Sequence, residues 1–124
     1  MKKKILLLTG TTGFVGYKFL SFALSNGFSV VDILREKNKK NKKIRELRNT
    51  YPKKYKNIFF ANNNNLSSQL KDIKADYFIN FATLYSNNHS HSQIVDFIDS
   101  NILFPTLIYD IINNKIKKMI NFGS

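Results

Sequence analysis

The chain has 124 residues, a formal net charge of +12 at pH 7 and a hydrophobic fraction of 43%, with 11 Phe and 6 Tyr. This composition indicates one globular domain over residues 1–124 and excludes a disordered chain. The absence of cysteine excludes disulfides and thiolate metal sites, as is usual in a reducing compartment. The first apolar run covers only Ile5 to Leu8, too short for a secretory signal or a membrane span. We therefore expect a cytoplasmic protein with no membrane partner.

The first thirty residues carry the strongest pattern in the chain. An apolar run at 4–9 leads directly into three glycines spaced three apart, and an amphipathic segment follows over about 14–26. This order predicts a buried strand, a tight turn and a helix whose N-terminus points at the turn. Such a turn lets an anion approach the backbone, and the helix N-terminus attracts a diphosphate. The residues expected around this site are Gly10, Thr12, Gly13, Phe14, Val15 and Gly16.

Strand and helix signals alternate along the rest of the chain. This alternation predicts an α/β fold, a doubly wound parallel sheet of about five strands with helices on both faces. We expect the strand order 3-2-1-4-5, with a ligand crevice between strands 1 and 4. The expected strands after the first are 28–34, 58–61, 76–82 and 119–122, and the expected helices after the first are 39–50, 66–73 and a long one over 94–112.

With these elements placed, the chain resembles the N-terminal half of the extended short-chain dehydrogenase/reductases, a family of nucleotide-sugar epimerases, dehydratases and reductases. The resemblance covers essentially the whole chain and implies a Rossmann-type NAD(P)-binding domain. Within the family, the chain looks most like bacterial synthases of CDP-linked dideoxysugars such as abequose. The motifs that carry the resemblance are Thr9-Gly10-x-x-Gly13-x-x-Gly16, Asp76-x-x-Ile79-Asn80-x-Ala82, Phe81-Ala82-Thr83-x-Tyr85, Asn101-x-x-x-Pro105 and Lys118-Met119-Ile120-Asn121-Phe122-Gly123-Ser124.

The end of the second strand bears on the choice between NAD and NADP. Families that prefer NAD place an acid there to bind the ribose 2′-hydroxyl. That position is Leu34 in this chain, Arg35 follows it, and Asp32 lies earlier in the strand. A guanidinium at the strand end, assisted by Lys37, Lys39 or Lys42, suits a 2′-phosphate. We therefore expect NADP rather than NAD, with a solvated surface arginine as the alternative.

The resemblance also implies roles for residues further along the chain. Phe81, Ala82 and Thr83 would line the ribose and nicotinamide side of the cofactor, and Asn101 would brace the active-site region. Ser124 would be the catalytic serine that polarises the substrate oxygen.

The tyrosine and lysine that complete the family's chemistry do not appear. No Tyr-x-x-x-Lys occurs in the sequence, and the substrate lobe is absent. We therefore expect a cofactor-binding half, cut before its catalytic tyrosine and inactive alone, with nucleotide-sugar binding dependent on the missing lobe. A non-catalytic NAD(P)-binding module is the alternative. Two histidines, His89 and His91, lack a third ligand and predict no metal site.

A basic segment covers residues 35–56. It holds eleven Lys or Arg residues against Glu36 and Glu46, a net charge of +9. Such a segment attracts polyanions, but no recognition motif accompanies it, so we expect a solvated helix rather than a nucleic-acid-binding protein. The shortened helices also leave open a homodimer through exposed apolar surface.

Overall fold

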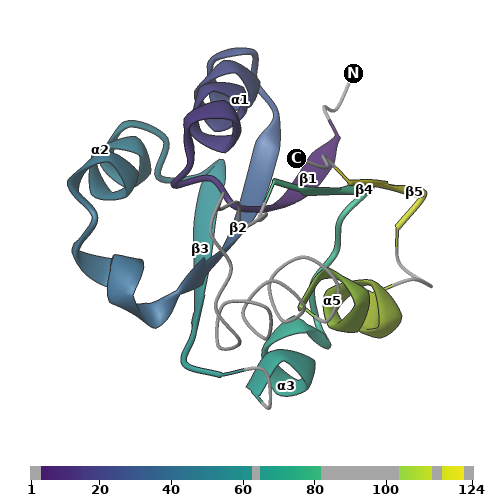
Figure 1. Cartoon of the computed structure of the whole chain (residues 1–124). Coiled ribbons are helices and arrows are strands. Elements are labelled where there is room, and N and C mark those ends of the chain that lie inside the picture. Colours follow the sequence, from purple (N-terminus) through teal and green to yellow (C-terminus); the bar gives the residue numbers. More distant parts are fainter. Residues whose placement is uncertain (1–3, 63–64, 82–103, 113–115, 122–124) are drawn as a thin grey trace, which may run out of the picture.

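The structure is a computed structural model that describes residues 4–62, 65–81, 104–112 and 116–121. Its five strands are parallel and form one sheet in the order β3-β2-β1-β4-β5, which confirms the predicted order (Figure 1). The elements are β1 (Ile5–Thr9), α1 (Phe14–Ser25), β2 (Ser29–Arg35), the 3-10 turn η1 (Glu36–Lys40), α2 (Lys42–Thr50), β3 (Tyr55–Phe60), α3 (Leu66–Leu70), β4 (Tyr77–Asn80), α5 (Phe104–Ile112) and β5 (Lys118–Asn121).

Helices cover both faces of the sheet, α1 and α2 on one side and α3 and α5 on the other (Figure 1). Because side chains alternate along a strand, β1 contributes to both cores. Leu6 and Leu8 pack with Leu20 of α1 and Ile44 of α2, while Leu7 packs with the core formed with α3 and α5. The central strands are therefore apolar on both sides, as a doubly wound sheet requires. No helix in the described part of the chain is long and apolar enough to cross a membrane.

The basic helix differs from the expected helix over 39–50. Its first residues form η1, and the α-helix begins only at Lys42. The Asn41 side chain explains this start, because its Oδ1 accepts a hydrogen bond from the Ile44 N–H at 3.2 Å. An asparagine that caps a helix satisfies a backbone donor that has no partner within the helix. The short 3-10 turn therefore connects the carboxyl end of β2 to α2.

The third strand begins at Tyr55 rather than at residue 58. The expected strand covered the apolar run 58–61, but the ladder with β2 runs from Val30 opposite Tyr55 to Arg35 opposite Phe60. The side chain of Tyr55 is buried while Lys56 is exposed, so the alternation of a strand is present. The extra residues include Tyr55, whose hydroxyl donates a hydrogen bond to Asp32 of β2. This contact belongs to the site described next.

Candidate cofactor-binding site

The loop between β1 and α1 has the geometry of a tight glycine turn. Gly10 adopts a φ of 77°, in the left-handed region that favours glycine. The Gly13 N–H donates to the Gly10 carbonyl at 3.3 Å and closes the turn. Gly13 itself is extended, with φ −80° and ψ 171°, and it forms the N-cap of α1. The strand therefore turns into the helix within four residues.

Gly16 allows α1 to pack directly on this loop. A Cβ at this position would lie 2.1 Å from the Gly10 carbonyl oxygen and 2.9 Å from the Gly10 carbonyl carbon. A Cβ at Gly13 would meet the same oxygen at 3.6 Å, an ordinary contact. Gly10 and Gly16 are thus required by the fold of the loop. Gly13 is not, so packing within the loop gives no reason for a glycine there.

The N-terminus of α1 is open to an anion. No side chain caps it, and its first turn contains no acidic residue. The first backbone N–H groups of a helix have no partner within the helix and carry a partial positive charge. Phe14 and Val15, which begin the helix, are 76% and 57% exposed. The site therefore offers backbone donors, positive potential and uncovered apolar surface together, as a phosphate-containing organic ligand requires.

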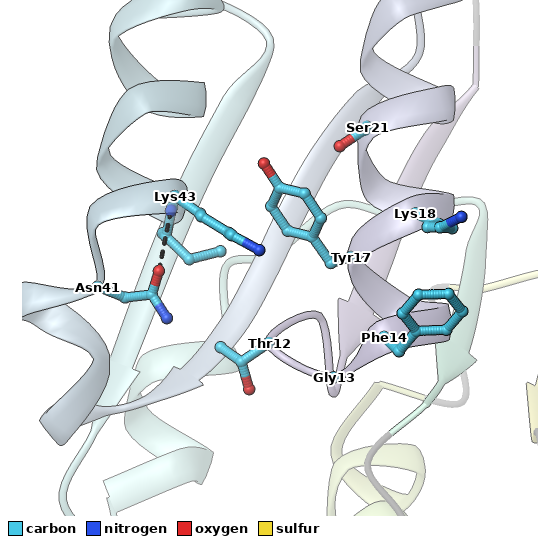
Figure 2. A pocket seen from close by; sticks show the side chains of 9 residues that line it. Thr12, Gly13, Phe14, Tyr17, Lys18, Ser21, Asn41 and Lys43 are labelled. Atoms are coloured by element: carbon cyan, nitrogen blue, oxygen red, sulfur yellow. Dashed lines mark hydrogen bonds between the residues drawn. The ribbon is translucent and has the colours of Figure 1, made fainter.

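A cavity of about 480 Å³ lies beside the glycine loop, between α1 and α2 (Figure 2). Figure 2 shows the Lys43 side chain extending from α2 toward Tyr17 of α1, with its ammonium 5.2 Å from the tyrosine ring centroid. Lys43 and Thr12 thus bring a cation and a hydroxyl to the same cavity. The lining residues are Thr12, Gly13, Phe14, Tyr17, Lys18, Ser21, Asn41, Lys43 and Ile44.

The end of β2 carries no carboxylate. Leu34 is only 3% exposed and packs in the core beneath α1 and α2. Arg35, the last residue of the strand, is exposed, and its guanidinium lies 5.5 Å from the Phe60 ring centroid and 5.9 Å from that of Phe104. These rings hold the guanidinium at the carboxyl edge of the sheet. The structure thus places Arg35 at the strand end, as predicted.

Lys43 was missed by the sequence reasoning, which considered Lys37, Lys39 and Lys42 as the lysines that assist Arg35. The ammonium of Lys39 lies 3.1 Å from the Glu36 carboxylate instead. Lys43 lines the cavity beside the glycine loop because Asn41 starts α2 at the following residue and the cavity lies between α1 and α2. The available signal was Asn41 three residues before the apolar Ile44, a helix-start pattern.

Polar side chains line the carboxyl ends of β1, β4 and β5. These residues are register partners: Thr9 lies opposite Asn80, and Asn80 opposite Asn121. The Thr9 hydroxyl donates to the Asn80 side-chain oxygen, and the Asn80 amide donates to the Asn121 side-chain oxygen at 2.6 Å. Phe81 follows this row and packs its ring 5.4 Å from that of Phe19 in α1. Its predicted contact with the cofactor stays a prediction.

The remaining predicted site residues lie outside the described part of the chain. These are Ala82, Thr83, Asn101 and Ser124, and their roles stay predictions. His89 and His91, for which no metal site is expected, also lie outside the described residues.

A buried polar cluster beneath the glycine loop was also missed. Asp32 of β2 is fully buried, and its Oδ2 accepts hydrogen bonds from the Thr11 hydroxyl at 2.6 Å and the Tyr55 hydroxyl at 2.5 Å. Burial raises the pKa of the Asp32 carboxyl to about 7, although both hydrogen bonds act to lower it. Burial, and then the nearby Asp32 carboxylate, raises the pKa of Tyr55. An acid in an otherwise apolar strand was the available signal.

Solved structures share this fold. A short-chain dehydrogenase from Streptomyces avermitilis superposes with a TM-score of 0.81 at 15% identity, covering 98% of this chain and 50% of that one. A short-chain dehydrogenase/reductase from Burkholderia multivorans with bound NADP superposes with a TM-score of 0.77 at 17% identity, covering 98% of this chain and 59% of that one. A UDP-glucose-4-epimerase from Stenotrophomonas maltophila with bound NAD and formylated UDP-arabinopyranose gives 0.77 at 16%, covering 98% and 37%. This chain therefore spans at most about three fifths of their lengths.

The parallel sheet, the glycine turn and the open helix N-terminus define an NAD(P)-binding Rossmann-type domain. The model of the NAD dependent epimerase/dehydratase family matches residues 6–124, and the chain belongs to that family. A search of curated protein sequences finds no match.

Proposed function

We propose that this domain binds NADP(H) and serves as the cofactor-binding portion of an oxidoreductase or epimerase that acts on a nucleotide sugar. The observation that carries the proposal is the glycine loop, whose packing against α1 leaves the helix N-terminus open. When bound, the nicotinamide of such a cofactor exchanges a hydride with the substrate. The residues of this chain bind and orient the cofactor.

The diphosphate of the cofactor would bind at the start of α1. The N–H groups of the first helical turn, which begins at Phe14, would donate to its oxygens, and the helix dipole would favour its charge. Gly13 would allow close approach because it presents no Cβ. The exposed side chains of Phe14 and Val15 would be covered by the bound ligand.

The preference for NADP rests on the charges around the adenosine end of the site. Leu34 supplies no carboxylate for a ribose 2′-hydroxyl. Arg35 at the carboxyl end of β2 and Lys43 in the cavity that Thr12 also lines supply cations instead. A 2′-phosphate carries about two negative charges, so charge-assisted contacts with Arg and Lys favour NADP over NAD.

The substrate proposal rests on the family and on the resemblance described above. The solved epimerase has bound NAD and formylated UDP-arabinopyranose. In this chain, the row formed by Thr9, Asn80 and Asn121 marks the sheet edge on the proposed substrate side. We propose Ser124 as the serine that polarises the substrate oxygen. Catalysis would need a Tyr-x-x-x-Lys outside this sequence, so the 124 residues alone would bind cofactor without turnover.

We expect the wild-type protein to bind NADPH more tightly than NADH. Arg35→Ala and Lys43→Ala should each weaken NADPH binding about tenfold and leave NADH binding nearly unchanged, because each removes one charge-assisted contact to the 2′-phosphate. Isothermal calorimetry with both cofactors would measure this.

Arg45→Ala is the matched control, since it removes one exposed charge from the same basic segment without touching the cavity. It should leave the ratio of the two affinities unchanged. Equal weakening of NADPH binding in all three variants would show a general charge effect and contradict the NADP assignment.

A further inference from the structure

One buried side chain ties the glycine loop to the sheet. Thr11 is fully buried, whereas the neighbouring Thr12 is exposed. The Thr11 hydroxyl donates to Asp32 Oδ2 across 21 residues of sequence. In the described part of the chain, this is the one side-chain hydrogen bond that joins residues 10–13 to the rest of the molecule. The backbone closes the loop with a rather long 3.3 Å hydrogen bond from Gly13 to Gly10.

Asp32, which accepts this hydrogen bond, lies in the middle of the sheet and accepts a second one from Tyr55. Asp32 lies opposite Leu8 of β1 and Asn57 of β3, on the sheet face covered by α1 and α2. Tyr55 donates its hydroxyl to the same oxygen, Oδ2, that accepts from Thr11. Thr11 and Tyr55 therefore share one acceptor oxygen, and each hydrogen bond can be removed separately. Asp32 Oδ1 has no hydrogen-bond partner in the described part of the chain.

A carboxyl group in this setting is unfavourable for the fold alone. Its neighbours along β2 on the same face are Val30 and Leu34, both in the apolar core. A hydrophobic side chain there would avoid burying a polar group with one unpartnered oxygen. An apolar residue would lose the contacts with Tyr55 and with Thr11, and of these two Thr11 belongs to the glycine loop. That loop begins α1, whose N–H groups form the proposed diphosphate site.

We propose that Asp32 is a positioning residue for the cofactor site: through Thr11 it holds the glycine loop in the orientation that presents its backbone N–H groups to the cofactor diphosphate. This inference rests on the proposed function, because it assigns a role within the same site. Asp32 acts through Thr11 and does not itself reach the cofactor. Tyr55 donates to the same carboxyl oxygen but is no part of the loop, so its hydrogen bond supports the fold rather than the loop contact.

Three variants separate positioning of the loop from general support of the fold. Thr11→Val removes the hydroxyl and keeps the shape of the side chain, so NADPH binding should weaken about tenfold, the equivalent of one net hydrogen bond. Thr11→Ser keeps the hydroxyl donor, so its Kd for NADPH should stay within about threefold of the wild-type value. Tyr55→Phe removes the other donor to the same oxygen without altering the loop, and should lower the melting temperature while changing the Kd by less than about twofold.

A second measurement needs no cofactor. The ¹⁵N relaxation order parameters of the Gly10 to Gly13 amides should fall in Thr11→Val from rigid values of about 0.85 toward flexible values of about 0.6, and should stay high in Thr11→Ser and Tyr55→Phe. Unchanged order parameters in Thr11→Val, or equal loss of NADPH binding in Thr11→Val and Tyr55→Phe, would overturn the proposal. If the wild type bound neither NADPH nor NADH, the proposed function would fail, and the order parameters would still decide whether Thr11 holds the loop.

Discussion

Gly16→Ala is expected to disrupt the domain, and Gly13→Ala is expected to leave it folded without a working cofactor site. At Gly16 the new Cβ would lie 2.1 Å from a backbone oxygen, so the loop and α1 would have to separate. Overpacking of this kind destabilises by about 3 kcal/mol, because the obstructing atoms belong to the backbone and cannot rotate away. Thermal and chemical unfolding of the purified variant would measure the loss.

Gly13→Ala is the matched variant in the same loop. Its Cβ would meet the nearest heavy atom at 3.6 Å, and its backbone is extended, so the stability should change by less than about 1 kcal/mol. The methyl group would stand where the diphosphate approaches the helix, so NADPH binding should weaken at least about tenfold. If Gly13→Ala bound NADPH as well as wild type, the glycine loop would be a structural turn only.

The stability of the wild-type domain is expected to fall, relative to Asp32→Asn, as the pH rises from about 4 to about 7. The pKa of the Asp32 carboxyl is about 7 in the folded protein against 3.8 for an exposed aspartate, because burial disfavours the charged form. Between these values the unfolded chain loses its proton while the folded chain keeps it, and this favours unfolding. A shift of this size corresponds to about 4 kcal/mol.

Urea unfolding of wild type and Asp32→Asn at several pH values would isolate this contribution. The gap between the two free energies of unfolding should widen in favour of the variant up to pH 7 and remain constant above it. Asp110→Asn, which removes an exposed carboxylate from α5, is the control and should follow the wild-type curve. Parallel curves for wild type and Asp32→Asn would show that Asp32 is already ionised at low pH in the folded state.

The glycine loop and the sheet order could be predicted because their signals are local. Gly10 is required by its left-handed backbone, and Gly16 is required because a Cβ there would meet the Gly10 carbonyl. The apolar run before these glycines fits a buried strand. Alternating strands and helices then leave few possible topologies. The position of Leu34 and Arg35 at the end of β2 could be predicted by counting residues along the strand.

The contacts that complete the site could not be predicted because they join distant residues. Thr11 and Asp32 are 21 positions apart, and their hydrogen bond depends on where the loop settles above β2. Tyr55 joins them because β3 starts at Tyr55, earlier than the expected strand at 58–61. Lys43 reaches the cavity because of the position of α2 beside α1, a matter of packing rather than local pattern.

The most direct test of the account is a titration of the ¹⁵N-labelled protein with NADPH, followed through its backbone amide signals. We predict that NADPH causes the largest changes in amide chemical shift from Gly10 to Gly16, with further changes at Arg35 and Lys43. With NADH, the chemical-shift changes at these residues should be smaller. Changes spread evenly over the Lys and Arg residues of the basic segment 35–56 and suppressed by salt would instead indicate nonspecific attraction of a polyanion to that segment. That result, or no change at the glycine loop, would contradict the assignment of this domain as an NADP-binding site.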